Sequence, residues 1–133
     1  MLEPEIRRAV ADGFDTFITG LALGVDTWAA EIVIKLINEG EKIHHISAVP
    51  FEGVENNRTE EDIARFKFII DNSDGTYYIS DHPSRKAFQK RDRWMVDHAE
   101  RIIAVFNGTR GGTAYTIDYA KSLGKEVVML SER

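Results

Sequence analysis

The chain alternates between short apolar runs rich in β-branched residues and longer segments whose apolar residues recur at helical spacing. This alternation predicts βα units, in which helices connect the parallel strands of an α/β fold. The expected strands cover residues 14–19, 43–49, 76–80, 101–106 and 126–130. Three expected helices cover residues 26–39, 84–99 and 113–123, and two more begin at residues 2 and 59. Residues 50–58 are expected to form a polar loop. With 133 residues and no internal repeat or linker, we expect one domain, residues 1–133.

The expected order begins with a helix, since Leu2, Ile6, Ala9 and Val10 recur at helical spacing. Doubly wound α/β folds usually open with a central strand. Three explanations stay open: the sheet begins late, a strand belongs to a longer product, or another chain supplies it. If a central strand is absent, the strand that starts near Phe14 has an unpaired edge, and such edges favour association. We therefore expect a homodimer or a higher homo-oligomer.

Composition narrows the class of protein. The chain is 43% hydrophobic and 29% charged, as is typical of soluble globular proteins, and no apolar run approaches the ~20 residues that span a bilayer. The N-terminus lacks the basic and apolar regions of a signal peptide. The absence of cysteine excludes disulfides and thiolate metal sites, and we expect a cytoplasmic location. The net charge of −5 argues against a broad nucleic-acid-binding surface.

Two glycine-rich segments, residues 17–26 and 104–113, lie where an expected strand runs into an expected helix. Helix N-termini carry free N–H groups and the positive end of the helix dipole, so such junctions suit phosphate or another anion. Neither the dinucleotide-binding glycine spacing nor the Gly-Lys-Ser/Thr of a P-loop is present. The alternative is that the glycines serve turn geometry alone. Two such junctions in one small domain favour a nucleotide-type ligand.

Residues 20–31, with the sequence GLALGVDTWAAE, resemble the signature of the YpsA-like group within the SLOG superfamily. Residues 49–51, residues 88–97 and the Gly-Gly-Thr at 111–113 agree with that group in the same order. The superfamily also contains the DNA-processing protein DprA and the LOG cytokinin-activating enzymes. The resemblance implies a Rossmann-like three-layer sandwich with a mostly parallel sheet, here lacking the usual first strand. It also implies a pocket for a nucleotide or nucleotide derivative at the carboxyl ends of the strands, where open α/β sheets bind ligands.

Two departures from the family pattern bear on function. Members of this group usually begin with a strand carrying a Thr-Gly-His-Arg-like segment that lines the pocket, and no segment here matches it. LOG enzymes carry a catalytic glutamate three residues after the Gly-Thr of their glycine motif. Alignment of Gly112 and Thr113 on that motif places Thr116 at the glutamate position. A hydroxyl cannot replace a carboxylate as a base at neutral pH, which argues against LOG-type hydrolysis.

Three charged residues are candidates for roles in the pocket. Asp26 either caps its helix or accepts a hydrogen bond from a ribose hydroxyl. Glu31 is either a solvated charge or, as the resemblance implies, a residue near the pocket. Asp26 and Glu31 are the candidates for a catalytic acid or base. Arg91 falls on the apolar face of its helix, where a guanidinium needs a partner. It pairs with an internal carboxylate such as Asp97 or Glu31, or it holds a ligand phosphate through parallel hydrogen bonds.

The histidines and the basic residues give weaker signals. His44 and His45 are neighbours in an expected strand and point to opposite faces, so we expect no metal site, and no cofactor is indicated. A basic run over residues 85–93 is interleaved with Phe88 and followed by Trp94. Such a run either binds single-stranded nucleic acid or forms a solvated helix face.

These observations predict a protein that binds a nucleotide or an ADP-ribose-like derivative. The predicted ligand-binding residues are Gly20, Leu21, Ala22, Gly24, Asp26, Arg91, Gly108, Gly111, Gly112 and Thr113. Two alternatives stay open: LOG-like phosphoribohydrolysis of a nucleoside monophosphate, and DprA-like binding of single-stranded DNA. The acidic net charge disfavours nucleic acid as a partner, and no membrane partner is expected.

Overall fold

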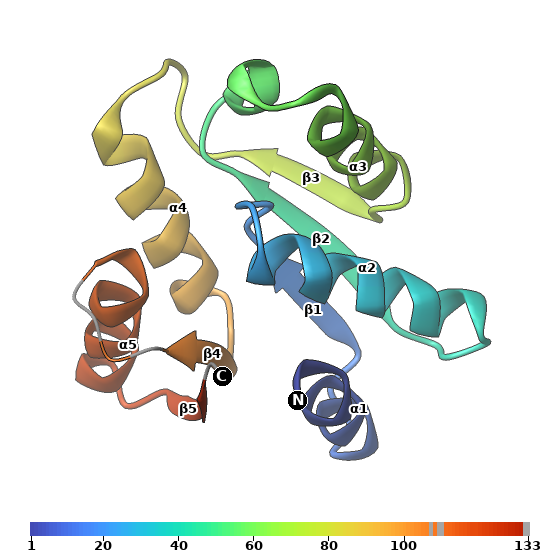
Figure 1. Ribbon diagram of the computed structural model, residues 1–133. Coiled ribbons are helices and arrows are strands. Elements are labelled where there is room, and N and C mark those ends of the chain that lie inside the picture. Colours follow the sequence, from blue (N-terminus) through green and yellow to red (C-terminus); the bar gives the residue numbers. More distant parts are fainter. Residues whose placement is uncertain (107, 109–110, 132–133) are drawn as a thin grey trace.

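The computed structural model describes residues 1–106, 108 and 111–131, and its elements follow the predicted alternation (Figure 1). The helices are α1 (Leu2–Ala11), α2 (Val25–Asn38), α3 (Glu60–Asp71), α4 (Arg85–Asp97) and α5 (Gly112–Ser122), with a short 3-10 helix, η1 (Val54–Asn57). The strands are β1 (Thr16–Thr19), β2 (His44–Val49), β3 (Gly75–Tyr78), β4 (Arg101–Phe106) and β5 (Glu126–Ser131). The predicted α/β class is confirmed, and η1 lies in the segment that we expected to be a loop.

Side-chain caps set the start of two helices. The Thr59 hydroxyl accepts a hydrogen bond from the backbone N–H of Asp62 at 3.1 Å, so α3 begins where the sequence predicted. Ser84 caps α4 in the same way, through the N–H of Ala87 at 3.1 Å. Such caps satisfy N–H groups that have no partner within the helix.

The strands form two parallel sheets, with the orders β1-β2-β3 and β4-β5. Thr16 of β1 pairs with His44, and Arg101 of β4 pairs with Glu126. Within the described residues, β1 and β4 are not paired with each other, although both line one cavity. The two sheets therefore meet at this cavity without strand pairing between them among the described residues.

Helices cover both faces of the strands. Helices α2 and α3 pack together on one face, and α4 lies on the other, in contact with α5 (Figure 1). Helix α1 joins the α2 layer, because Ile6 packs with Val33 and Leu36. Phe17 of β1 and Ile103 of β4 pack against the same cluster, so α1 connects the two sheets. Among the described residues, no helix has the length and apolar character needed to cross a bilayer.

A buried hydrogen-bonded chain of polar side chains links the first two strands to the end of α3. His45 is fully buried; its Nε2 lies 2.8 Å from the Thr19 hydroxyl and its Nδ1 lies 2.9 Å from the Ser73 hydroxyl. Because Ser73 donates to the carbonyl of Ile69, the Nδ1 of His45 carries the proton. Burial lowers the pKa of His45 to about 4, so the ring is neutral near pH 7.

This histidine gives the protein an acid-sensitive stability. Unfolding restores an ordinary imidazole, so the unfolded chain takes up a proton at a higher pH than the folded chain. We expect the free energy of unfolding to fall by about 3 kcal/mol between pH 6.5 and pH 4 on account of His45. Urea titrations across that range should show a smaller decline in His45→Gln. A variant of the exposed neighbour, His44→Gln, is the matched control, and an equal decline in both variants would contradict this assignment.

Candidate functional site

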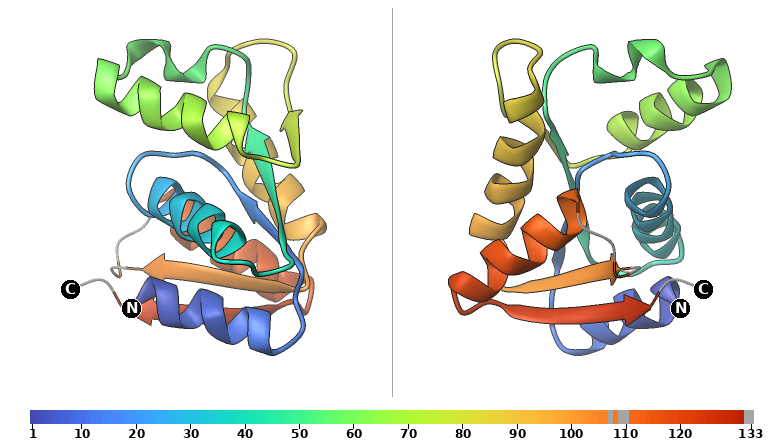
Figure 2. Two further views of the ribbon diagram at one scale, coloured as in Figure 1. Left: turned by 90° about the vertical axis from the view of Figure 1, so that its right-hand side faces the viewer. Right: turned by 60° about the vertical axis from the view of Figure 1, so that its left-hand side comes forward.

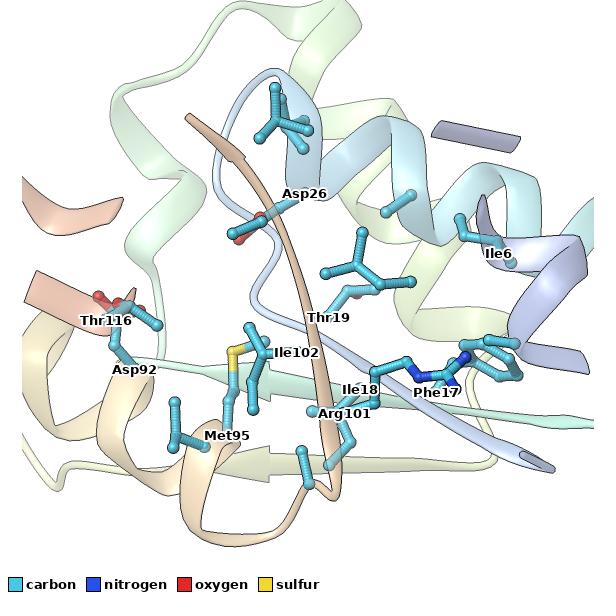
Figure 3. A pocket seen from close by; sticks show the side chains of 18 of the residues that line it. Ile6, Phe17, Ile18, Thr19, Asp26, Asp92, Met95, Arg101, Ile102 and Thr116 are labelled. Carbon is cyan, nitrogen blue, oxygen red and sulfur yellow. The ribbon is translucent and has the colours of Figure 1, made fainter. Parts of the chain in front are cut away.

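A cavity of about 890 Å³ lies between β1 and β4 and extends to their carboxyl ends. Figure 3 shows side chains that line it, among them Asp26, Asp92 and Thr116. Its walls come from both strands, from the loops that follow them, and from α1, α2, α4 and the start of α5. The loops after β1 and β4 both reach this cavity. The two glycine-rich junctions that the sequence singled out therefore meet at one cavity.

The backbone of residues 20–24 gives the first loop its shape. Leu21 has a positive φ of 58°, a conformation that leucine rarely adopts, and its side chain is only 1% exposed. It packs in the core with Ala30 and Ile34 of α2, and this burial offsets the backbone strain. Gly24 has a φ of 84° and precedes α2, which has no side-chain cap. Gly20, Leu21 and Gly24 therefore shape the loop. None of these three predicted ligand-binding residues is among the described residues that line the cavity.

Gly20 lies against two charged side chains. A Cβ at Gly20 would lie 2.8 Å from Oδ2 of Asp26 and 3.0 Å from Nη1 of Arg91. Nη1 of Arg91 donates a hydrogen bond to the Gly20 carbonyl at 2.5 Å, and Nε donates to Oδ1 of Asp92 at 2.7 Å. Only a residue without a side chain permits this approach of α4 to the loop after β1.

Asp26, Arg91 and Asp92 form a charged cluster at the cavity, with two carboxyl groups around one buried guanidinium. Burial raises the pKa of Asp26, and Asp92 adds to that rise, whereas Arg91 opposes it. The N–H of Ala22 donates to Asp26 and also favours its charged form. Asp26 is thus a carboxyl group that can hold a proton at a higher pH than an ordinary aspartate.

The predicted pairing of Arg91 with an internal carboxylate is confirmed, but the partner is Asp92, and the two examples that the sequence suggested are wrong. Asp97 instead accepts a hydrogen bond from the Tyr119 hydroxyl at 2.6 Å. Glu31 forms a two-point ion pair with Arg65 of α3, at 2.6 and 2.9 Å. The sequence reasoning considered Asp97, farther along the same helix, and Glu31, on another helix, whereas the actual carboxylate partner is the next residue in the chain.

Glu31 also departs from the place that the resemblance implied. It lies between α2 and α3, and it is not among the described residues that line the cavity. Of the two carboxylates considered as an acid or base, only Asp26 faces the cavity. Asp92 was missed by the sequence reasoning, and its position beside Arg91 on an otherwise apolar helix face is the signal that would have found it.

The second glycine-rich junction contributes the start of α5. Gly111, Gly112 and Thr113 line the cavity, and a Cβ at Gly112 would lie 3.9 Å from Oδ2 of Asp92. Thr116, at the LOG glutamate position, also lines the cavity, and its hydroxyl donates to the Gly112 carbonyl at 2.9 Å. Gly108 is exposed and has a φ of 89°. The rest of the predicted loop, residues 107 and 109–110, lies outside the described residues.

Three other predicted ligand-binding residues also line the cavity: Ala22, Asp26 and Arg91. Across the part of the chain that the structure describes, no three histidine, aspartate or glutamate side chains are arranged to hold a metal ion. The chemistry available around Gly20 and the start of α5 is therefore that of backbone N–H groups, the Arg91 guanidinium, the carboxyl groups of Asp26 and Asp92, and threonine hydroxyls. The cavity lining also includes Arg101, Asp15, Glu100 and His98.

Comparison with known proteins identifies the family. Residues 1–129 match the model of the YpsA family, which is described as the YspA SLOG family. The chain belongs to this family. YpsA-family relatives include YoqJ, an uncharacterised SPbeta prophage-derived protein of Bacillus subtilis (strain 168), with 30% identity over 79% of this chain and 68% of YoqJ. A UPF0398 protein of Bacillus cereus (strain G9842) is 25% identical over 93% of this chain and 69% of its own length.

A solved structure shows the same fold. The DNA processing protein A (DprA) of Streptococcus pneumoniae superimposes on 89% of this chain with a TM-score of 0.65 and 20% identity. The chain spans 40% of that DprA chain. The Rossmann-like α/β fold that the resemblance implied is therefore confirmed.

The close contacts of Gly20 can be tested by measuring the free energy of unfolding of a variant at this position. We expect Gly20→Ala to lower the free energy of unfolding by about 1–3 kcal/mol, because the added methyl group overlaps Asp26 and the buried Arg91. Gly112→Ala is the matched control, since its added methyl group meets no atom closer than 3.9 Å. Urea unfolding of both variants measures the difference, and equal stabilities would show that the loop and α4 are not held together at Gly20.

Proposed function

We propose that the cavity binds a nucleotide or a nucleotide derivative of the ADP-ribose type. The observation that carries the proposal is the convergence of two glycine-rich strand-to-helix loops, with one buried arginine, on a single cavity at the carboxyl ends of parallel strands. Ligands bind in this position in open α/β sheets. The cavity volume of about 890 Å³ lies within the range of small-molecule sites.

The start of α5 is the proposed phosphate-binding element. Gly111, Gly112 and Thr113 present the free N–H groups and the positive dipole end of that helix to the cavity, and α5 has no side-chain cap. Ala22 and Asp26 form the opposite wall. A carboxyl group there can accept a hydrogen bond from a ribose hydroxyl.

Arg91 serves the site in two ways under this proposal. It contacts the first loop through the Gly20 carbonyl, and it supplies a positive charge beside Asp26 and Asp92. Its Nε hydrogen bond to Asp92 sets the direction of the guanidinium plane. An anionic ligand would share this charge with the two carboxyl groups.

A phosphoribohydrolase is the second candidate, and the specific observation in its favour is Asp26. The raised pKa of Asp26 suits a proton donor to a leaving base. Two observations weigh against hydrolysis: Glu31 is paired with Arg65, and Thr116 occupies the position of the LOG glutamate. We therefore propose binding without turnover.

We also propose that the chain forms a homo-oligomer, because β1 and β4 each have an edge that is unpaired among the described strands. Light scattering at several protein concentrations measures the mass, and a monomer throughout would contradict self-association. The lack of cysteine supports a cytoplasmic location.

Ligand binding is tested first by thermal shift. AMP, ADP-ribose or NAD at 100-fold its Kd should stabilise the folded chain by about 2.7 kcal/mol and raise Tm accordingly. Arg91→Ala should weaken binding in calorimetry, at a temperature where circular dichroism shows the variant to be folded. Lys90→Ala, an exposed neighbour on the same helix, is the matched control. A Tm that none of the three compounds changes contradicts the proposal, and a shift only with single-stranded DNA supports the DprA-like alternative.

Turnover is tested separately. Wild-type protein incubated with AMP should release no adenine, as measured by chromatography. If adenine does accumulate and Asp26→Asn stops the release while AMP still binds, the chain is a hydrolase and the binding-only proposal is wrong.

A further inference from the structure

Thr19, the last residue of β1, lies between the cavity and a buried histidine. It lines the cavity and is only 6% exposed (Figure 3). Its Oγ1 lies 2.8 Å from Nε2 of His45 on β2, and the side chain of His45 is completely buried. The nucleotide-binding elements named above include neither residue.

Both residues lie on the face of the strands that α2 covers. Phe17 of β1 and Val49 of β2 pack with residues of α2. Thr19 and His45 stand an even number of positions from them in the same strands, so their side chains point to the same face. Figure 2 shows α2 on one side of these strands and α4 on the other. The imidazole is therefore enclosed beneath the helices, and Thr19 connects it to the cavity.

The far end of this hydrogen-bonded chain fixes the position of the ring proton. The Ser73 hydroxyl donates its single proton to the Ile69 carbonyl at 2.7 Å. Toward Nδ1 of His45, 2.9 Å away, the same hydroxyl can only accept, so Nδ1 carries the proton. The Ser47 hydroxyl, 2.6 Å from that of Ser73, donates to it as well. In the neutral ring, Nε2 is left as an acceptor.

The direction of the last hydrogen bond follows from this assignment. The Thr19 hydroxyl donates its one proton to Nε2 of His45. Its oxygen also has two lone pairs, and among the described residues it forms no other hydrogen bond. Thr19 thus presents only an acceptor to the cavity. To act as a donor there, it would leave a buried Nε2 without a partner, which is costly.

The same arrangement does not make Thr19 a nucleophile. A base that takes the proton of a hydroxyl becomes charged, and burial lowers the pKa of His45 to about 4. Asp74 accepts from the backbone N–H of His45 at 2.9 Å, and the group that holds Nδ1 is the uncharged Ser73. The imidazole therefore orients the Thr19 hydroxyl without activating it.

Asp26 places a second polar group close to the end of β1. A Cβ at Gly20, the residue after Thr19, would lie 2.8 Å from Oδ2 of Asp26. Both Thr19 and Asp26 line the cavity, as Figure 3 shows. The vicinal hydroxyls of a ribose are two neighbouring donors and match two neighbouring acceptors. Phosphate oxygens only accept, so they do not suit this position.

We propose that Thr19 is a specificity-determining residue that accepts a hydrogen bond from one ribose hydroxyl of the bound nucleotide, in a direction set by His45. This inference rests on the proposed nucleotide function and deepens it, because it names the ligand group at the end of β1. The site then distinguishes a hydroxyl from a fluorine, which is similar in size but donates no proton.

Calorimetry with AMP and its 2′-fluoro and 3′-fluoro analogues tests the contact with the ligand. We expect one analogue to bind the wild-type chain about tenfold more weakly than AMP, because the fluorine facing Thr19 loses a hydrogen bond. Thr19→Val keeps the shape but removes the acceptor, so it should bring that ratio of affinities close to one. Thr19→Ser should restore the ratio. A variant that is merely less stable would bind both ligands with an unchanged ratio.

Thr76→Val is the matched control for the valine substitution. Thr76 lies on β3 and is not among the described residues that line the cavity, so this variant should keep the wild-type ratio.

Nitrogen NMR of the His45 ring tests the proton assignment without a ligand, and His45→Gln identifies the signals by removing them. We expect a protonated Nδ1 and an unprotonated Nε2 in the wild-type chain. In Thr19→Val, the Nε2 signal should move toward that of a nitrogen that accepts no hydrogen bond. A proton on Nε2 would make Thr19 a donor to the cavity, and this result overturns the proposal.

The two proposals fail in different ways. If AMP, ADP-ribose and NAD all leave the wild-type Tm unchanged, the nucleotide proposal fails, and the Thr19 proposal fails with it. If AMP binds in a way that depends on Arg91 but both fluoro analogues bind as tightly as AMP, only the Thr19 proposal is overturned. The same holds if Thr19→Val keeps the wild-type ratio.

Discussion

Among the described residues, the two sheets of this molecule are joined by contacts of helices α1 and α4 rather than by pairing between β1 and β4. Arg91 reaches from α4 to the Gly20 carbonyl, 71 residues away in the chain, while its Nε is held by Asp92. Helix α1 makes the second connection, since Ile6 shares a cluster with residues of both β1 and β4. A buried arginine is costly unless every direction of its fork is used, and here a carbonyl and a carboxylate use two of them. The glycine at position 20 is what lets α4 come close enough.

This arrangement explains why the residues that line the cavity are polar in one part and apolar in another. Near the carboxyl ends of the strands it is polar, with Asp26, Asp92 and the start of α5 around Arg91. Deeper in, between β1 and β4, it is bounded by apolar side chains and strand edges. The polar region has the N–H groups and the positive charge that an anion needs, whereas the apolar region offers an anion no partner.

The sequence predicted the elements well and the side-chain pairs poorly. Strand and helix ends fell within one or two residues, because caps such as Thr59 and the period of apolar residues are local signals. The burial of Arg91 was expected from its helix face, and it is 6% exposed. Its partners were not predictable, because the Gly20 carbonyl comes close only through the tertiary fold. Glu31 shows the same limit, since its Arg65 partner lies on another helix. The chain of hydrogen bonds through His45 also depends on contacts between β1, β2 and α3.

The buried side chain and left-handed backbone of Leu21 limit how far the loop after β1 can change its conformation. Its left-handed backbone turns the chain toward the cavity, while its side chain is anchored among Ala30, Ile34 and Val49 in the core. The loop cannot relax to a more common conformation without withdrawing a leucine from that core, at a cost of roughly 2 kcal/mol. The wall is therefore set before a ligand arrives, so little conformational entropy remains to be lost on association. Selectivity at this wall then rests on shape, because a rigid loop excludes groups that a mobile one would accommodate.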